Sequence, residues 1–462
     1  MSGPTRGAPN CRRVFVESET TFGSPVTQYP LAVSALRILS STVTAKKPRR
    51  AREDGFCSAS KIGSIAEKAT AEWSIEFAMG TPGTAATAPD WNDLLVNALC
   101  MVQVAAVADT AISGGASTTT VLGVTSSTNF TALKSAVTVN GETRRVTAKT
   151  TGSPDTITVS PPLSAIPTAL DVVTSGVSYY FDDDADATPR AVTLWIMNNA
   201  NQWRLTGAVA TSASISGGGT TTLRMTISGV AREARQLFTG TCPAGINGAV
   251  TSMVVSYAGL VPDDVSAANP YYLTMSAGLA AEESVQVTAK AGTTYTIVRA
   301  QPSGSAQTHA AGATVEPYAP TGTYLETPIP ATGGSYYAAG VLTRVESFGF
   351  ELDPGLLLRE NVHGTAYTVF DYIQGQRTIT ASAAAWSDNN PTMLRVFDAG
   401  ARTATEMFAQ QGDTTGYIVA AVCPNTYVEI PEHAYSADAQ RLDLTGEAVG
   451  LLGEDEFFLM LG

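Results

Sequence analysis

The sequence predicts a mainly β protein with a minor helical part. We expect two tandem β-sandwich or half-barrel domains, each with a short helix and a small β insertion. The segment Leu223–Ala231 (LRMTISGVA) aligns without a gap with Gln440–Ala448 (QRLDLTGEA), and a further matching strand, Thr206–Ser216 or Ala420–Ile430, precedes each copy. The 462 residues also exceed the size of one ordinary domain. A duplicated β module suits a ring-forming part better than a pocket built for one substrate.

Composition and charge exclude several classes of protein. Only 15% of the residues are charged and the net charge is −13, which argues against a nucleic-acid binder, because such proteins neutralise phosphates with clustered Lys and Arg. The N-terminus lacks a secretory signal pattern, and no run of about eighteen apolar residues predicts a membrane span. Five scattered cysteines with no CxxC pair predict reduced thiols in a protein that folds in a cytoplasm; they are Cys11, Cys57, Cys100, Cys242 and Cys423.

The first half of the chain predicts two strands and a helix. A strand is expected around Leu31–Thr44. Apolar residues alternate with polar ones over Ala71–Phe77, and this period of two predicts a strand with one buried face. The apolar stripe over Asp90–Val102 predicts a helix that follows Pro89 and is capped by Asp90.

The second half repeats this order. We expect a strand at Gly340–Glu351, an Arg-bearing loop near Leu358–Asn361 and a strand at Gln376–Ala385. A short helix is expected at Thr403–Gln411, ending at the C′ glycine Gly412.

Each half also predicts a small β insertion. In the first, two short β runs flank Asn140-Gly141, the strongest two-residue hairpin signal; in the second, similar runs flank Ala291-Gly292. The expected first domain therefore covers residues 1–110 and 181–245 around an insertion at 111–180. The second covers 246–265 and 335–462 around an insertion at 266–334.

Several segments together carry a family resemblance. They are Glu17–Pro25 (ESETTFGSP), Ala88–Leu95 (APDWNDLL), the strands from Thr193 to Ala208 and from Thr222 to Gly229, and the closing segment Ala420–Gly450. In this order they resemble the tail tube proteins of long-tailed bacteriophages, over most of the chain outside the two insertions. The motifs are patterns of residues rather than invariant signatures.

This resemblance implies a structural virion protein. Subunits of the family generally supply one tube domain each and six form a ring; the duplication resembles the rarer arrangement in which three chains form a pseudo-sixfold ring. The sequence leaves open whether three or six chains close the ring. The resemblance implies assembly in the host cytoplasm into a hollow tail tube, through which genomic DNA passes without specific binding. The implied partners are further copies of the chain, the tape-measure protein, and the tail terminator and distal tail proteins.

The sequence contains one dense cation cluster, and the family's corresponding loop reaches toward the adjacent ring. An inter-ring or inter-subunit contact is therefore implied, with a solvated loop as the alternative. The cations are Lys46, Lys47, Arg49, Arg50 and Arg52.

An acidic run offers a complementary surface. Asp182, Asp183 and Asp184 begin like a calcium loop, but Ala187 and Thr193 stand where an EF-hand needs its glycine and its glutamate. A solvated acidic turn, or a partner for the basic run, is expected instead.

No catalytic, cofactor-binding or metal site is predicted, so we do not expect an enzyme. His309, His363 and His433 lie far apart in the sequence, and no GxSxG elbow is present. Two acids could still meet from distant positions, although no pair stands out.

Two other classes of function stay open. One is a virion adhesin or decoration protein that binds the host surface or glycans, since Ser/Thr/Gly-rich β proteins often do so. The other is a virion-associated hydrolase, although the short regular repeat of a long β-helix is missing.

Overall fold

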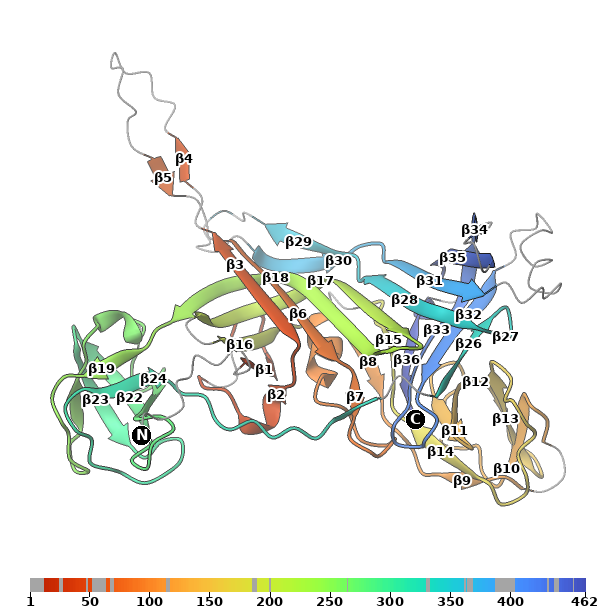
Figure 1. The fold of residues 1–462 in the computed structure, drawn as a ribbon, viewed down its shortest axis with the longest axis horizontal. Coiled ribbons are helices and arrows are strands. Elements are labelled where there is room, and N and C mark those ends of the chain that lie inside the picture. Colours follow the sequence, from red (N-terminus) through yellow and green to blue (C-terminus); the bar gives the residue numbers. More distant parts are fainter. Residues whose placement is uncertain are drawn as a thin grey trace, which may run out of the picture.

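A computed structural model describes most of the chain. It covers residues 12–24, 28–46, 49–51, 64–66, 70–113, 117–184, 189–198, 201–263, 265–329, 333–360, 363, 369–386, 404–429, 432–435, 440–451 and 453–462. The described chain is mainly β (Figure 1), which confirms the predicted fold class.

A long antiparallel sheet passes through both halves of the chain and runs across the middle of Figure 1. Its order is β3, β6, β18, β17, β28, β31, β35 and β34. The bounds are β3 (Ser40–Lys46), β6 (Thr70–Ala78), β18 (Thr221–Leu237), β17 (Asn201–Gly218), β28 (Val345–Asp353), β31 (Thr378–Trp386), β35 (Gln440–Ala448) and β34 (Glu432–Tyr435).

The two halves of this sheet repeat one topology. β3, β6, β18 and β17 correspond to β28, β31, β35 and the pair β33 (Val419–Val428) and β34. The registers agree as well: Met225 lies opposite Phe77, and its counterpart Leu442 lies opposite Ala385. The alignment of 223–231 with 440–448 therefore corresponds to equal places in the sheet.

The glycine shared by the two copies has a physical reason. A Cβ on Gly229 would lie 1.9 Å from the carbonyl oxygen of Val209, and one on Gly446 would lie 3.0 Å from that of Tyr427. Both positions lie where a neighbouring strand crosses too closely for a side chain.

A second layer of strands covers one face of the long sheet and is also duplicated. In the first half, the start of β17 pairs with β16, β16 pairs with β1, and β1 pairs with β2. In the second half, β33 pairs with β32, β32 with β26, and β26 with β27, in the same order. The C-terminal β36 then joins β33 to β15 and β8 of the first half. The bounds are β1 (Arg12–Ser18), β2 (Ala35–Leu36), β16 (Val192–Asn198), β26 (Gly334–Ala338), β27 (Val341–Thr343), β32 (Thr405–Gln411), β8 (Met101–Val104), β15 (Ser178–Phe181) and β36 (Phe458–Leu461).

One apolar core lies between these layers and spans both halves. It includes Trp73 and Phe77 from the first half and Phe350 and Leu444 from the second. In β6 the buried residues alternate with partly or fully exposed ones, as the period of two predicted.

The two insertions are small sheets of identical strand order. β9 to β14 in the first correspond, strand by strand, to β19 to β24 in the second. Val146–Lys149 and Val287–Lys290 share the letters VTAK, and both carry the same register shift. The bounds are β9 (Thr110–Ala111), β10 (Val121–Val124), β11 (Ala136–Val139), β12 (Glu142–Thr150), β13 (Asp155–Ser160), β14 (Val172–Gly176), β19 (Gly240–Cys242), β20 (Ser252–Val254), β21 (Tyr271–Met275), β22 (Glu283–Ala291), β23 (Thr294–Arg299) and β24 (Ala313–Pro317).

This match corrects two expectations. Both predicted hairpins form, but Asn140-Gly141 joins β11 to β12 whereas Ala291-Gly292 joins β22 to β23, so they are not counterparts. The second insertion also begins earlier than residue 266. β19, which we expected in the first domain (181–245), and β20, which we expected in the second (246–265), both pair within its sheet.

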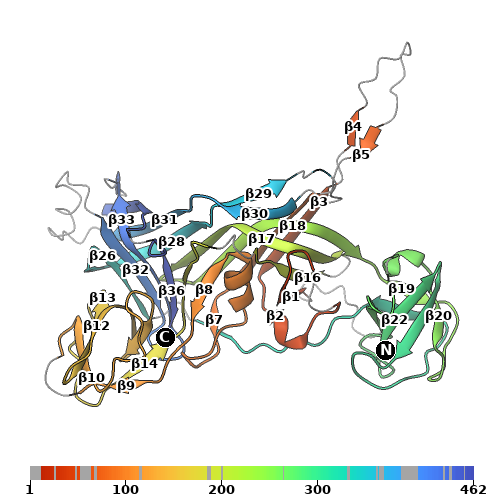
Figure 2. The same cartoon turned by 180° about the vertical axis from the view of Figure 1, so that it is seen from behind.

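The insertions lie at opposite ends of the molecule, on the same side of the long sheet (Figures 1 and 2). The second packs on the first half, where Phe15 and Trp195 share its apolar core. The first packs on the second half, where the buried Arg144 guanidinium lies 5.2 Å from the Tyr337 ring centroid and 5.0 Å from that of Phe408. Each insertion thus covers the corresponding outer face of the opposite half.

The helix expected at Thr403–Gln411 is wrong. Thr405–Gln411 forms β32, hydrogen-bonded between β26 and β33. Met407 to Gln411 are all buried, so the segment shows no alternation that would separate a strand from a short helix.

The helix expected at Asp90–Val102 is shorter. η2 (Leu94–Ala98) is followed by Cys100 at φ 58°, and Met101 already begins β8. The Asp90 carboxylate does not cap this helix; it accepts the backbone N–H of Leu325 at 3.1 Å.

The remaining elements are short. The strand expected around Leu31–Thr44 is divided into η1 (Ala32–Ser34), β2 and β3. The others are β4 (Arg49–Ala51), β5 (Ser64–Ala66), β7 (Gly80–Thr81), η3 (Ala258–Leu260), β25 (Thr327–Pro328), β29 (Leu356–Glu360) and β30 (Val369–Gln374).

Candidate functional site

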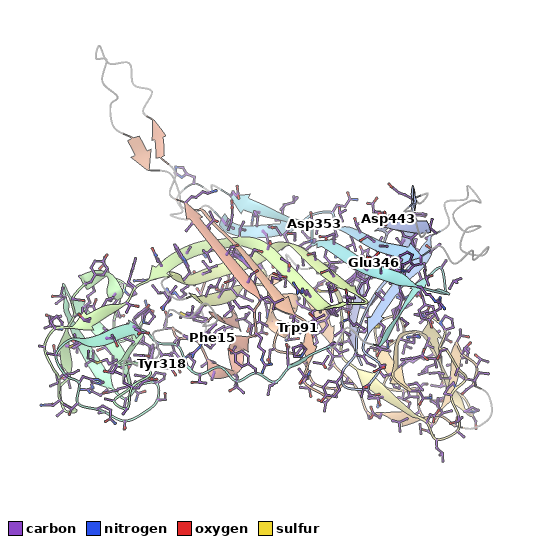
Figure 3. The ribbon with its side chains drawn as sticks, in the orientation of Figure 1. Phe15, Trp91, Tyr318, Glu346, Asp353 and Asp443 are labelled. Carbon is purple, nitrogen blue, oxygen red and sulfur yellow. The ribbon has the colours of Figure 1, made fainter. Side chains whose placement is uncertain are left out.

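The face of the long sheet turned away from the apolar core is the principal candidate surface. Most exposed or half-buried positions on this face carry hydroxyl or acidic side chains, and acids outnumber cations among the described residues. Val209 and Val230 are apolar exceptions that pack against the hairpin β29–β30. Figure 3 shows Asp353 and Asp443 along this side, with Glu346 nearby, whereas Phe15 and Trp91 lie on the other side. The charged side chains of this face include the acids Glu72, Glu76, Glu351, Asp353, Asp443 and Glu447 and the cations Lys46, Arg224 and Arg232. We call this surface the polar face.

One cation of the polar face, Arg224, is paired with an acid of the same face. Arg224 Nη1 lies 3.2 Å from Glu76 Oε1, and Glu76 Oε2 also accepts the Ser40 hydroxyl at 3.1 Å. Such an exposed pair contributes about 0.2–1 kcal/mol, but it removes a free cation from the surface.

The acids keep the face negative rather than forming a reactive pair. Partial burial raises the pKa of Glu351, and no other charge contributes to that shift. Among the described residues, no three His, Cys, Asp or Glu side chains gather in a way that would hold a metal ion.

The two ends of the long sheet are open edges. Among the strands that the structure describes, β3 pairs only with β6, and β34 pairs only with β35. An open edge presents backbone N–H and C=O groups that favour pairing with a further strand.

The predicted basic run lies at one of these edges. Lys46 is the exposed last residue of β3. Arg49 and Arg50 lie in β4, which pairs with β5 in a hairpin that extends away from both sheets (Figure 1). Lys47 and Arg52 lie outside the described residues.

The acidic run is engaged inside the chain. Asp182 Oδ2 lies 2.5 Å from Arg190 Nη2, and Asp183 forms an ion pair with Arg377. Arg377 also contacts Glu456, so these acids tie the end of β15 to the second half. Asp184 is exposed. None of the three pairs with a described cation of the basic run.

Sequence reasoning missed one cluster in the second insertion. Ser276 Oγ lies 3.0 Å from His309 Nδ1, and His309 Nε2 lies 3.0 Å from Glu283 Oε2. This resembles the connectivity of a nucleophile, a base and an acid. No spacing motif joins these residues, so no sequence signal could have revealed them.

The geometry assigns this cluster a structural role. All three side chains are buried, so no substrate can reach the Ser276 hydroxyl. Glu283 also accepts Arg299 Nε at 2.7 Å and the backbone N–H groups of Ala300 and Gln307. Despite the opposing effect of burial, these donors lower the pKa of Glu283 to about 2. The carboxylate thus fixes the connection between β23 and β24.

The cysteines show no paired arrangement among the described residues. Cys100, Cys242 and Cys423 are buried free thiols, and burial raises the pKa of each. Cys11 and Cys57 lie outside the described residues.

No helix in the described part of the chain is both long and apolar enough to span a membrane.

Neither comparison by sequence identifies a relative: no protein-family model matches the chain, and no curated protein matches it significantly.

Proposed function

We propose that this chain is a structural subunit of a bacteriophage tail tube. Copies assemble into rings, the rings stack, and the polar face of the long sheet lines the channel. The observation that carries this proposal is the repetition of one sheet order in both halves, because a duplicated module joined edge to edge can continue around a closed ring.

The chemistry of the polar face supports a conduit. Duplex DNA carries roughly one negative charge per 1.7 Å, and a basic lining would hold it through released counterions. Hydroxyl and carboxylate groups offer no such trap, because neither carries the positive charge that attracts phosphate. DNA therefore passes without specific binding, and the tape-measure protein occupies the same channel before ejection.

The remaining partners follow from the same proposal. A ring of three chains has six similar modules, and the tail terminator and distal tail proteins bind the ends of the stack in the virion. The two insertions lie on the side of the long sheet opposite the polar face (Figure 1), which supports a position on the outside of the proposed tube.

Electron microscopy of the purified chain tests the function. We expect rings or hollow tubes about 10 nm wide, an estimate from domains of ordinary size. A chain that stays monomeric at high concentration and binds glycans would support a virion adhesin instead.

Reversing charge on the polar face tests the conduit. We expect tubes of the double variant Glu72→Lys/Glu351→Lys to retain duplex DNA at low salt, with binding that falls steeply between about 50 and 200 mM salt. Fluorescence anisotropy with labelled duplex DNA measures this. The matched control is Asp184→Lys/Glu282→Lys, which reverses two exposed acids away from the polar face. Equal DNA retention by both variants would show that the polar face does not line the channel.

A further inference from the structure

The chain already contains one junction between its two repeated modules. The far part of β17, in the first half, pairs antiparallel with β28, the first long-sheet strand of the second half. Ser214 lies opposite Glu351, Ile215 opposite Phe350 and Ser216 opposite Gly349.

Both strands of this junction have counterparts that lack it. Trp73 in β6 and Ala381 in β31 are equivalent, because each lies opposite the shared glycine of its half. Val43 of β3 lies opposite Trp73, and Phe350 of β28 lies opposite Ala381. β3 therefore corresponds to β28. His433 of β34 lies opposite Leu442, and Ile215 of β17 lies opposite Met225, the counterpart of Leu442. β34 therefore corresponds to the far part of β17.

We propose that β34 of one copy pairs antiparallel with β3 of a second copy, in the register of the internal junction. Glu432 then lies opposite Thr44, His433 opposite Val43 and Ala434 opposite Thr42. The inference rests on the proposed self-assembly and specifies which two edges meet and in which register.

The properties of β3 suit this contact. Its sequence, SSTVTAK, is rich in β-branched residues and contains no proline, and Thr42, Thr44 and Ala45 are exposed. Val43 is only half-buried although it packs against the apolar core, so an added strand would complete its burial. Thr42 and Thr44 lie on the same side of the sheet as Glu72. The polar face therefore continues across the proposed contact from one copy to the next.

The hairpins that follow β3 and β28 support the same arrangement independently. β29–β30 follows β28 and packs back on the first half, where the hydroxyl of Tyr372 accepts the backbone N–H of Arg190 at 2.6 Å. Its side chains share a small core with Phe22 and Val209. β4–β5 follows β3 in the same way but extends away from its own chain (Figure 1).

By this equivalence, β4–β5 lies on the second half of the copy whose β34 pairs with β3. The basic run at Lys46, Arg49 and Arg50 is thereby assigned to a contact between neighbours within one ring.

Cysteine cross-linking tests the register. In a background with Cys11 and Cys57 replaced by serine, the double variant Thr44→Cys/Glu432→Cys is assembled and mildly oxidised. Directly opposed residues on antiparallel strands have Cα atoms about 4.5–5.5 Å apart, within the range of a disulfide. We expect a shift from monomer to covalent multimers on non-reducing denaturing gels, with the largest species giving the number of chains in a ring.

Two control variants show what a correct and an incorrect register give. Ser214→Cys/Glu351→Cys holds the equivalent positions of the internal junction and should form a disulfide within one chain. Thr44→Cys/Ala434→Cys is out of register by two residues and should cross-link far less.

The outcomes separate the register from the function. Tubes that form but cross-link no better with Thr44/Glu432 than with Thr44/Ala434 would overturn the register and leave the proposed function standing. A double variant and a parent chain that both stay monomeric would overturn the proposed function as well.

Discussion

Replacing Glu283 by alanine is expected to destabilise the second insertion by about 3–5 kcal/mol, the usual effect of removing one partner from a buried charge pair. The buried Arg299 guanidinium loses both of its hydrogen bonds to the carboxylate, at 2.7 and 2.5 Å, and His309 loses its acceptor. Hydrogen exchange should show much weaker protection of amides in β22 and β24. The neighbouring Glu282 is exposed, so Glu282→Ala should change protection by less than about 1 kcal/mol. Equal effects of the two substitutions would contradict the role assigned to Glu283.

The same carboxylate predicts how stability depends on pH. Its pKa in the folded chain is lowered to about 2, from an ordinary value of 4.5. A lowered pKa means that the stabilising contribution is complete above pH 4.5 and is lost as the pH falls toward 2. Glu283→Gln, which cannot ionise, should lose this part of the acid dependence. An unchanged acid profile in Glu283→Gln would place the dependence elsewhere.

Replacing Trp91 by alanine is expected to cost about 3–5 kcal/mol, because it removes a large buried ring from a close-packed core. Trp91 is fully buried, its ring centroid lies 5.9 Å from that of Tyr179, and its indole N–H donates to the carbonyl of Gly80 at 3.2 Å. The substitution therefore leaves a cavity and removes a hydrogen-bond donor from the Gly80 carbonyl of β7. The denaturant midpoint of the purified chain measures the loss.

Trp386 provides the matched control. It ends β31 and is 40% exposed, so Trp386→Ala removes the same side chain without opening a cavity in the core. We expect the midpoint to move much less than in Trp91→Ala. If the two midpoints moved equally, the core between the two layers would not be the main source of stability.

The sequence predicted the strands whose two faces differ. β6 and β18 carry alternating apolar residues, because one face packs on the core and the other is the polar face. The segment of β32 was predicted as a helix that ends at the C′ glycine Gly412. It shows no period of two because strands pair with it on both sides and its later residues are all buried. The helix around Trp91 was predicted too long because Met101–Val104 pairs with β15 and is drawn into the sheet.

Much of the candidate site lay beyond sequence reasoning. The basic and acidic runs at Lys46 and Asp182 are visible as charge, but their partners are not. Asp183 contacts Arg377, nearly two hundred residues away, and this pairing follows from how β15 meets the second half. Likewise, the polar residues of separate strands form one surface only after the register of the long sheet is fixed.

By itself, the sequence determined that the chain is a β protein with an internal repeat, because alternation and matched residues are local properties of the chain. Only the tertiary structure decided how the two repeats join and which edges stay open. Each insertion packs on the opposite half, and β17 reaches β28 across more than one hundred intervening residues. Such contacts depend on shape and register summed over the whole molecule, and no local pattern of residues encodes them.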